Sequence, residues 1–410
     1  MKEYVIAIDL GSGYIKAGLG YNSEESFEII AICEVPSLGI KNGLIINTQK
    51  ASESIKKSIH NLKNMTNFEK FEYLPVVVGI NGKSIFSAKS SNGMISIRNN
   101  KPIDENDIKK VIEQAKIAAV IPSEHEVIYI HPNNFIVDSH KNIKNPIGMF
   151  GRRLEVETYV VSVESLMIKN IKTVLNNAGV FDAQIYLNPI AQKYGILDEE
   201  EMNESVIIID VGKNLSTISL WNGDALVYLE TYEQGLNITI EEISRDISIP
   251  KNLSEKILKT VGLPNLYQFN YEDNEIEIYD EKRNETVKVS TRRIASIMAE
   301  ILSSIFTKIY SNIEKAGFFK NSPVPIIYLS GGAAEIEGIS QIVESVFNLP
   351  VYIAKPSIKV NDTKYLSPRY VTIAGLIKLY FEKPKDKITK SETKENIFLK
   401  FFNKLKELIE

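Results

Sequence analysis

The sequence predicts an α/β protein with two related lobes facing each other across a cleft, an inserted α+β subdomain and a C-terminal amphipathic helix. Three observations carry this prediction. A strand, a tight turn and a second strand occur in each half of the chain, at residues 4–19 and 206–220. A stretch that mixes strands with a helix, residues 83–161, separates these two units. After Phe381 the composition changes to a charged segment with few apolar residues.

Apolar periodicity gives the order of elements in the first half. The expected elements are strands at 4–10, 14–19 and 75–80, a helix at 51–62, and, in the insertion, a helix at 107–120 with strands at 127–130 and 135–138. An amphipathic pattern over 161–179 then predicts a helix that ends at Gly179. Its apolar side carries Leu166, Ile168, Ile171, Val174 and Leu175.

The second half repeats the strand–turn–strand device and adds a more polar stretch. The expected elements are strands at 206–210 and 215–220, a helix at 238–247, strands at 275–279 and 286–289, a long helix at 291–317 and a buried strand at 326–329. The predicted organisation is a first lobe (1–82 and 162–190), the inserted subdomain (83–161), a second lobe (191–227 and 292–381), a small subdomain (228–291), a linker (382–395) and the amphipathic helix (396–410).

Composition excludes several classes of protein. An apolar fraction of 44%, a charged fraction of 24% and a net charge of −4 are those of an ordinary globular chain and give no reason to expect nucleic-acid binding. One cysteine and four histidines argue against disulfides and structural zinc. No signal peptide is expected, and no stretch approaches the roughly 18 apolar residues of a membrane-spanning helix. His131, within a strand pattern, is interpreted as structural, and there is no triad pattern for nucleophilic catalysis.

Two aspartate-led turns are candidate phosphate sites. In the first, Asp9 precedes Gly11, Ser12, Gly13, Tyr14 and Lys16, so that close backbone N–H groups, a hydroxyl and a cation meet at one turn. In the second, Asp210 precedes Gly212, Lys213, Asn214, Ser216 and Thr217. Asp9 and Asp210 would hold Mg²⁺, most readily through water. The alternative for each turn alone is a plain β-hairpin.

A third turn follows the strand at 326–329. Gly331, Gly332 and Ala333 lead into a helix start, where bare backbone would let a flat adenine ring lie against it. The alternative is a simple strand-to-helix turn. The three turns in this order are far more specific than any one of them, and the arrangement resembles the superfamily of actin, sugar kinases and heat-shock chaperone ATPases.

The inserted stretch narrows the resemblance. The runs Ile130-His131-Pro132-Asn133-Asn134 and Asn145-Pro146-Ile147-Gly148-Met149-Phe150-Gly151-Arg152-Arg153-Leu154 look like those of the FtsA family of bacterial cell-division proteins. The resemblance extends from Tyr4 to about Phe381, and the segment from Ser367-Pro368-Arg369 to Leu376 suits the closing helix of the family. It implies an actin-like two-lobed ATPase fold with its insertion at this point in the chain.

The resemblance also implies a nucleotide site, and this chain departs from the family pattern at two places in that site. ATP and Mg²⁺ would lie among the three turns and Gly235, with Glu255 and Lys259 near the nucleoside. Lys213-Asn214-Leu215 stands where the family usually has a glycine-rich turn, and Leu258 stands at the position of a family lysine. Backbone donors carry much of the binding, so binding should survive, and the chain is expected to be at most a weak ATPase.

The C-terminal residues predict a helix that lies on a membrane surface. One broad helical face gathers apolar residues, namely Ile397, Phe398, Phe401, Phe402, Leu405, Leu408 and Ile409. Lysines on the flanks would attract anionic lipids by about 1 kcal/mol each near the surface. The alternatives are packing on the chain's own core, which the linker disfavours, or on a partner groove.

By resemblance, the chain would polymerise and anchor the division-ring polymer FtsZ to the cytoplasmic face of the cell membrane at the division site. The insertion would make filament contacts, and the small subdomain with Arg292 and Arg293 would meet FtsZ; other division proteins are possible partners. Two alternatives share the fold: a PilM-like scaffold of a membrane machine and a small-molecule kinase. The amphipathic tail favours the first interpretation over both.

Overall fold

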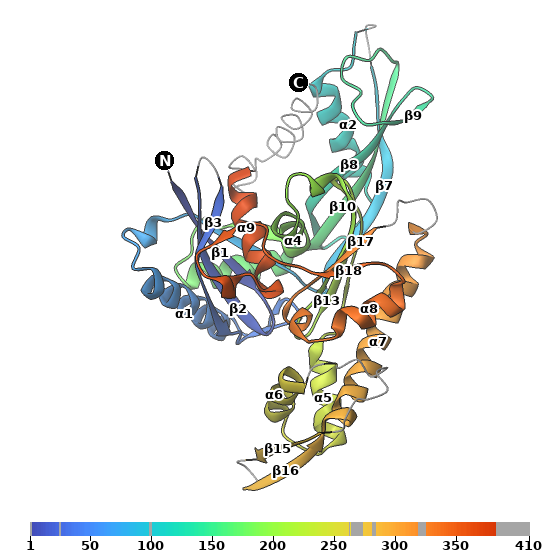
Figure 1. The fold of residues 1–410 in the computed structure, drawn as a ribbon. Helices are drawn as coiled ribbons and strands as arrows, with labels where there is room; N and C mark the ends of the chain where they lie inside the picture. The colour runs from blue at the N-terminus through green and yellow to red at the C-terminus, as the bar shows by residue number, and fades with distance from the viewer. Residues whose placement is uncertain are drawn as a thin grey trace.

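The computed structural model describes residues 2–23, 26–97, 101–261, 263, 274–280, 284–318 and 325–382. These residues form two central sheets side by side, with a separate sheet at one end of the molecule and a helical part with a two-stranded hairpin at the other (Figure 1). The two-lobed α/β class with an inserted α+β subdomain, predicted from the sequence, is confirmed.

The first lobe is a six-stranded sheet of order β11-β6-β1-β2-β3-β19. Its strands are β1 (Glu3–Leu10), β2 (Tyr14–Asn22), β3 (Phe27–Pro36), β6 (Val76–Ile80), β11 (Gln184–Leu187) and β19 (Lys359–Val360). Helix α9 (Val371–Glu382) packs on the face of β2 that carries Gly18 and Gly20. Helix α1 (Thr48–Thr66) covers the opposite face, where the Cys33 Sγ donates to the Ser58 carbonyl at 3.1 Å. Helices on both faces account for the nearly continuous apolar strands.

The second lobe repeats this arrangement in a five-stranded sheet of order β14-β13-β12-β17-β18. Its strands are β12 (Ser205–Val211), β13 (Ser216–Asn222), β14 (Ala225–Tyr232), β17 (Ile326–Ser330) and β18 (Val351–Ile353). As β1 pairs antiparallel with β2 and parallel with β6, so β12 pairs antiparallel with β13 and parallel with β17. Val206 and Ile208 face the core of the first lobe while Ile207 and Ile209 face that of the second, so β12 is buried on both sides.

Two further sheets lie at the ends of the molecule. The inserted sheet has the order β7-β10-β8-β9 and its own apolar core under α2. Its elements are β7 (Ile85–Ser96), α2 (Glu105–Ala118), β8 (His125–Val137), β9 (His140–Ile143) and β10 (Arg153–Glu164). At the other end lie α5 (Leu236–Asp246), α6 (Lys251–Val261), β15 (Glu275–Asp280), β16 (Glu285–Ser290) and α7 (Thr291–Lys315) (Figure 1).

Shorter elements complete the description. They are β4 (Ile40–Lys41), β5 (Leu44–Ile45), α3 (Ser165–Asn177), α4 (Asn188–Ile196), α8 (Ile339–Phe347) and five 3₁₀ turns, η1 (Phe71–Tyr73), η2 (Glu201–Asn203), η4 (Gly332–Glu335), η5 (Thr363–Tyr365) and η6 (Pro368–Tyr370).

Two sequence predictions about the insertion were wrong. The helix expected at 161–179 begins only at Ser165, because the apolar run before it pairs with β7 and β8 as strand β10, and Leu166 is 64% exposed instead of buried. The strands expected at 127–130 and 135–138 are one strand, β8. Pro132, which cannot donate to a sheet, is accommodated beside a register shift at Asn133, so the strand continues through it.

The end of the second-lobe range also needs correction. Residues 292–381 were assigned to the second lobe, but β19 pairs with β3 and α9 packs on the first-lobe sheet. The remaining boundaries stay predictions. The side chain of Lys259, the linker beyond Glu382 and the predicted helix at 396–410 lie outside the described residues.

Helix α7 passes a test that the sequence analysis did not anticipate. Of the described helices it alone is long and apolar enough to cross a membrane, by length and composition. Its buried residues recur every three or four positions and belong to the core of the second lobe: Ile294, Met298, Leu302, Ile305, Phe306, Ile309 and Ile313. This pattern is typical of a core helix of a globular domain.

Helices α4 and α9 cross in backbone contact between the two sheets. A Cβ on Gly375 would lie 1.6 Å from the Ala191 carbonyl oxygen, and one on Gly195 would lie 1.9 Å from that of Val371. Only glycine fits at either position.

Replacing Gly375 tests this crossing. Gly375→Ala should force the helices apart and lower the free energy of unfolding by about 3 kcal/mol, measured by urea unfolding with the fluorescence of the single tryptophan, Trp221. Gly317→Ala is the control: its φ is +80° but nothing lies within 4 Å of the new Cβ. The control should cost about 1 kcal/mol, and equal losses in both variants would refute the steric account.

Candidate functional site

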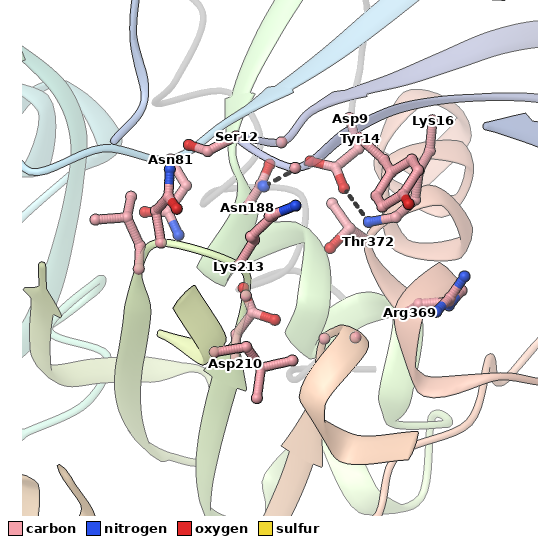
Figure 2. Close-up of a pocket in the computed structure, with 18 of the residues that line it drawn as sticks. Asp9, Ser12, Tyr14, Lys16, Asn81, Asn188, Asp210, Lys213, Arg369 and Thr372 are labelled. Carbon is pink, nitrogen blue, oxygen red and sulfur yellow. Dashed lines mark hydrogen bonds and ion pairs between the residues drawn. The ribbon is translucent and has the colours of Figure 1, made fainter. Parts of the chain in front are cut away.

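A cleft between the two central sheets gathers the three predicted turns. Its empty space is about 1060 Å³, including the part open to solvent. The first lobe contributes Asp9 and the turn that follows it, and the second lobe contributes Asp210 with its turn and the Gly331-Gly332 pair (Figure 2). Residues separated by more than 300 positions in the chain therefore line one cavity.

The first turn presents backbone donors to the cleft. A Cβ on Gly11 would lie 2.6 Å from the Tyr14 carbonyl oxygen, so the tight return of the chain requires glycine there. The Ser12 Oγ accepts a hydrogen bond from the Gly43 N–H at 3.3 Å, which holds the turn in place. Within the described residues, the amide groups of Ser12 and Gly13 donate to no protein acceptor. They are available to an anion.

The second turn has the same property on the opposite lobe. The Gly212 N–H donates to the Leu215 carbonyl at 2.9 Å, and the Lys213 carbonyl accepts from the Asn237 N–H at 2.8 Å. These bonds fix the backbone of the turn. The amides of Lys213 and Asn214 have no acceptor among the residues that the structure describes. Four residues with such N–H groups, two from each lobe, therefore line one cavity.

The glycine pair after β17 is shaped by its neighbours. Gly331 has a φ of +86°, and a Cβ there would lie 2.4 Å from Oδ1 of Asp210, so this position admits only glycine. At Gly332, by contrast, a Cβ would meet nothing within 4 Å. The backbone at Gly332 thus borders open space in the cleft and can lie flat against a planar ring.

Asp9 is neutralised within the first lobe. Its Oδ2 accepts from the Lys16 Nζ at 2.9 Å, and its Oδ1 accepts from the Asn188 Nδ2 at 2.8 Å. Burial alone would lower the pKa of Lys16, but the charge and hydrogen bond of Asp9, together with Glu34 and Asp210, outweigh burial and raise that pKa. Lys16 therefore stays charged and is paired with Asp9. The sequence analysis had proposed Lys16 as the cation of a phosphate-binding turn.

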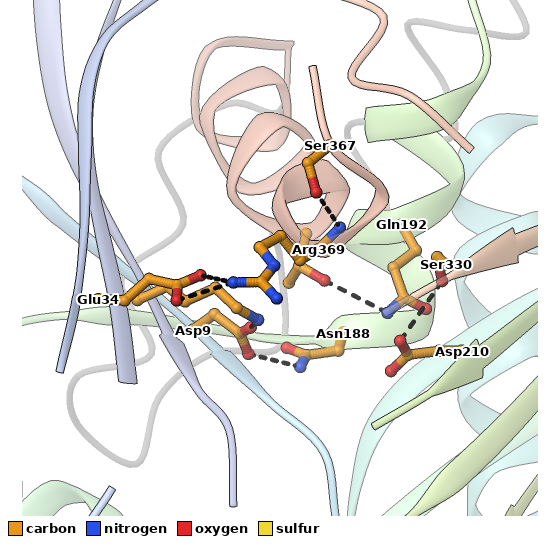
Figure 3. Close-up of polar contacts among 10 residues, drawn as sticks. Asp9, Glu34, Asn188, Gln192, Asp210, Ser330, Ser367 and Arg369 are labelled. Atoms are coloured by element: carbon orange, nitrogen blue, oxygen red, sulfur yellow. Dashed lines mark hydrogen bonds and ion pairs between the residues drawn. The ribbon is translucent and has the colours of Figure 1, made fainter. Parts of the chain in front are cut away.

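Asp210 lacks such a cation of its own. Burial raises its pKa, and Asp9 raises it further, while Lys16 and hydrogen bonds from Gln192 and Ser330 oppose the shift. Figure 3 shows the contact between Ser330 and Asp210. Two carboxylates on opposite lobes thus share one lysine. No cluster of three or more histidine, cysteine or acidic residues that could bind a metal occurs among the described residues. A cation at Asp9 and Asp210 would need water or ligand oxygens to complete its shell.

Five of the remaining sequence-predicted residues do not line the cleft. The Ser216 Oγ donates to the Gln234 carbonyl at 2.6 Å, and the Thr217 Oγ1 accepts from the Asn81 Nδ2 at 2.8 Å, so both hydroxyls are used within the protein. Gly235 supports the second turn from behind, since a Cβ there would lie 2.7 Å from the Lys213 carbonyl oxygen. Ala333 is buried, and Arg292 is exposed on α7.

Three other predicted residues have partners of their own. The Glu255 Oε2 lies at the cleft and pairs with the Lys213 Nζ at 2.9 Å. Arg293, on the first turn of α7, forms a two-pronged ion pair with Asp246 at 2.5 and 2.7 Å. Both interactions link elements that the sequence did not place together.

The structure adds cleft residues that the sequence analysis did not assign. Arg369 reaches Glu34 of β3 at 3.1 Å (Figure 3). It also reaches Glu335 of η4 at 2.5 Å and so joins the two lobes. The other additions include Asn81, Asn188, Leu236, Ile240, Leu258 and Thr372. The Asn188-Pro189 pair, which directly follows a short apolar run, was a usable signal for a helix start at the cleft.

Comparisons of the sequence agree with the resemblance seen in its motifs. A family model described as the SHS2 domain inserted in FtsA matches residues 82–162, and one described as cell division protein FtsA matches residues 207–375. The cell division protein FtsA of Borreliella burgdorferi is 29% identical over 409 residues, covering 99% of this chain and 98% of that relative. That of Bacillus subtilis is 28% identical over 381 residues, covering 92% and 83%.

Solved structures share the fold at low sequence identity. A PilM–PilN type IV pilus biogenesis complex has a TM-score of 0.64 with 13% identity, covering 91% of this chain and 97% of that chain. MreB5 of Spiroplasma citri bound to ADP has a TM-score of 0.54 with 14% identity, covering 92% and 96%. A MamK double helical filament also has a TM-score of 0.54, with 10% identity, covering 93% and 100%.

Asp210→Asn tests the electrostatics of the cleft. The pKa of Asp210 is raised by burial, so the unfolded chain releases this proton first as the pH rises above the ordinary aspartate value of 3.8. The native state then binds more protons than the unfolded state, and the free energy of unfolding falls with pH over that window. Asp210→Asn removes the ionisable group and with it this decrease in the free energy of unfolding. Its melting temperature should exceed that of the wild type at about pH 7, with the difference disappearing towards about pH 4.

The matched control for this experiment is Asp182→Asn, at an exposed aspartate outside the cleft. It should follow the wild type throughout. If the Asp210 difference did not change with pH, the raised pKa would not be its cause.

Proposed function

The chain belongs to the FtsA family of actin-like cell-division proteins, and on that premise we propose that it binds ATP–Mg²⁺ in the cleft, self-associates, and tethers FtsZ to the cytoplasmic face of the membrane at the division site. The observation that carries the proposal is that four residues from two lobes line one cavity and that their backbone N–H groups have no acceptor among the described residues. Such donors bind phosphate oxygens without added charge.

The shape and charge of the cleft support a nucleotide with a divalent cation. In this proposal the turns after Asp9 and Asp210 hold the phosphates, and the Gly331-Gly332 backbone receives the adenine. The two aspartates share one lysine, so a Mg²⁺ ion held through water would supply the positive charge that the pair lacks. MreB5, a fold neighbour, has been solved with ADP.

A weak hydrolytic activity follows from how the carboxylates of the cleft are used. Asp9, Glu34 and Glu255 are each in an ion pair with a lysine or arginine. Among the described residues lining the cleft, this leaves Asp210 without an ion pair, and burial raises its pKa. One carboxylate then has to serve both cation binding and any proton transfer, so we propose a role that is mainly structural.

Membrane attachment is proposed to rest on residues 396–410. The described core ends at Glu382 on α9, at the edge of the first lobe, and the charged linker follows. The apolar face of residues 397–409 fits the interface of an anionic bilayer. A single short helix binds reversibly, so firm attachment would come from many copies joined in one polymer.

The proposed partners are FtsZ and further copies of this chain. Fold neighbours include a MamK filament, and the insertion, with its separate core, is our candidate for filament contacts. For FtsZ the candidate surface lies at the opposite end of the molecule, around Arg292 and Arg293. Arg293 is 62% exposed and already pairs with Asp246, so an acidic partner would compete for it there.

The nucleotide site can be tested by filling it. In Gly332→Val the new Cβ would have no protein atom within 4 Å, so the chain should fold with an almost unchanged melting temperature. Its affinity for ATP–Mg²⁺, measured by isothermal titration calorimetry, should fall at least about tenfold, or about 1.4 kcal/mol. Unchanged affinity would place the nucleotide elsewhere.

The tether can be tested by removing residues 396–410. The full chain should sediment with anionic liposomes and bring FtsZ with it, whereas the truncated chain should bind FtsZ in solution but leave it in the supernatant. Neutral liposomes are the lipid control, since the lysines of the tail require anionic headgroups. Equal sedimentation of both chains would defeat the anchor, and loss of FtsZ binding by both would defeat the partner assignment.

A further inference from the structure

The Lys213 side chain lies between the two phosphate turns. A Cβ on Gly13, in the first lobe, would be 3.0 Å from both Cβ and Cδ of Lys213. Its Nζ continues to the Oε2 of Glu255 on α6, at 2.9 Å. Figure 2 shows Lys213 between Ser12 of the first lobe and Asp210 of the second. One flexible side chain thus touches the first lobe, the second turn and the small subdomain.

The backbone beneath this side chain is fixed. The Lys213 carbonyl accepts from the Asn237 N–H at 2.8 Å, and Gly235 packs so closely that a Cβ there would lie 2.7 Å from the same oxygen. Any response of Lys213 to a ligand therefore occurs in its four-carbon chain, and the position of its amide N–H is preserved.

Of the three cations that line the described cleft, Lys213 is the easiest to redirect. The Lys16 side chain is 16% exposed and committed to Asp9, and that of Arg369 is 25% exposed and clamped between two carboxylates. Lys213 is 34% exposed and pairs with Glu255, itself 25% exposed. An ion pair this open to water contributes little to stability. A phosphate chain with several negative charges competes effectively for the lysine.

We propose that Lys213 exchanges Glu255 for the phosphate chain of the bound nucleotide, so that this residue senses how many phosphates are present. The inference rests on the proposed nucleotide site and specifies how that site discriminates. Because Glu255 is on α6, the exchange breaks the charged link between the phosphate turn and the small subdomain. Binding of the nucleotide would then change how the phosphate turn is linked to the end of the molecule that carries α5, α6 and the β15–β16 hairpin.

The experiment compares ATP, ADP and AMP on the full chain by isothermal titration calorimetry. Lys213→Gln should weaken ATP binding about tenfold, ADP binding less and AMP binding by under about twofold, as expected when one charge-assisted bond to phosphate is lost. Glu255→Gln frees the lysine from its competitor and should raise the ratio of ATP to AMP affinity. Because ATP and AMP share the nucleoside, the loss of any contact between Glu255 and the nucleoside would change both affinities equally and leave their ratio unchanged.

Lys251→Gln is the matched control, because Lys251 is an exposed lysine on α6, the helix that carries Glu255, and pairs with Glu241. This variant should leave the affinities for ATP, ADP and AMP unchanged. Equal weakening of ATP and AMP by Lys213→Gln, or a fall in the affinity ratio in Glu255→Gln, would overturn the inference and leave the nucleotide site standing. A wild-type chain that bound none of the three nucleotides would overturn the proposed function and the inference together.

Discussion

The close crossing of α4 and α9 is the contact on which the rest of the structure depends. Backbone meets backbone at Gly195 and Gly375, and no side chain separates the helices. Helix α4 carries the chain from β11 of the first sheet towards β12 of the second, and α9 returns to the first sheet. The crossing therefore fixes the distance between the two sheets. Since β1, β12 and β17 each end at the cleft, that distance decides whether their three turns share one cavity.

Polar contacts then tune the cleft that the crossing creates. Arg369 spans Glu34 and Glu335 from opposite lobes, and the Asn81 side chain of the first lobe donates to Thr217 of the second. These contacts join the walls of the cleft, while the N–H groups of Ser12, Gly13, Lys213 and Asn214 keep no acceptor among the described residues. Donors left unsatisfied by the protein are costly in a dry interior but available at a wet cleft, and their placement on both lobes favours a ligand that bridges them.

Local sequence patterns predicted most of the helices and strands. The features that they missed depend on contacts between residues far apart in the chain. The strand–turn–strand units at Gly11 and Gly212 are encoded within a dozen residues, so alternation and turn chemistry were enough to find them. Arg369, Glu34 and Asn188 come from three remote segments, and no local pattern marks them as neighbours. The run before Ser165 fits helical and strand periodicity alike, and pairing with β7 and β8 decides in favour of the strand. The structure places Lys16 at the cleft, but its ion pair with Asp9 is a side-chain contact that the sequence pattern did not show.

The charges in the cleft favour binding of a ligand that brings cations to Asp9 and Asp210. Asp9 and Asp210 approach from opposite lobes and share Lys16, and burial raises the pKa of Asp210 because its charge is poorly compensated. The two carboxylates therefore repel each other across the cleft. A ligand that supplies cations between the aspartates and phosphate oxygens to the four N–H groups relieves that repulsion. Because it binds only the folded chain, it also stabilises that chain, with its lobes bridged by the ligand, by mass action. Closure set by the ligand would fix the angle between the inserted sheet and the small subdomain, which lie at opposite ends of the molecule. In the proposed self-assembly that angle would have to be constant from copy to copy, so weak charge compensation in the cleft would make the assembly respond to the ligand.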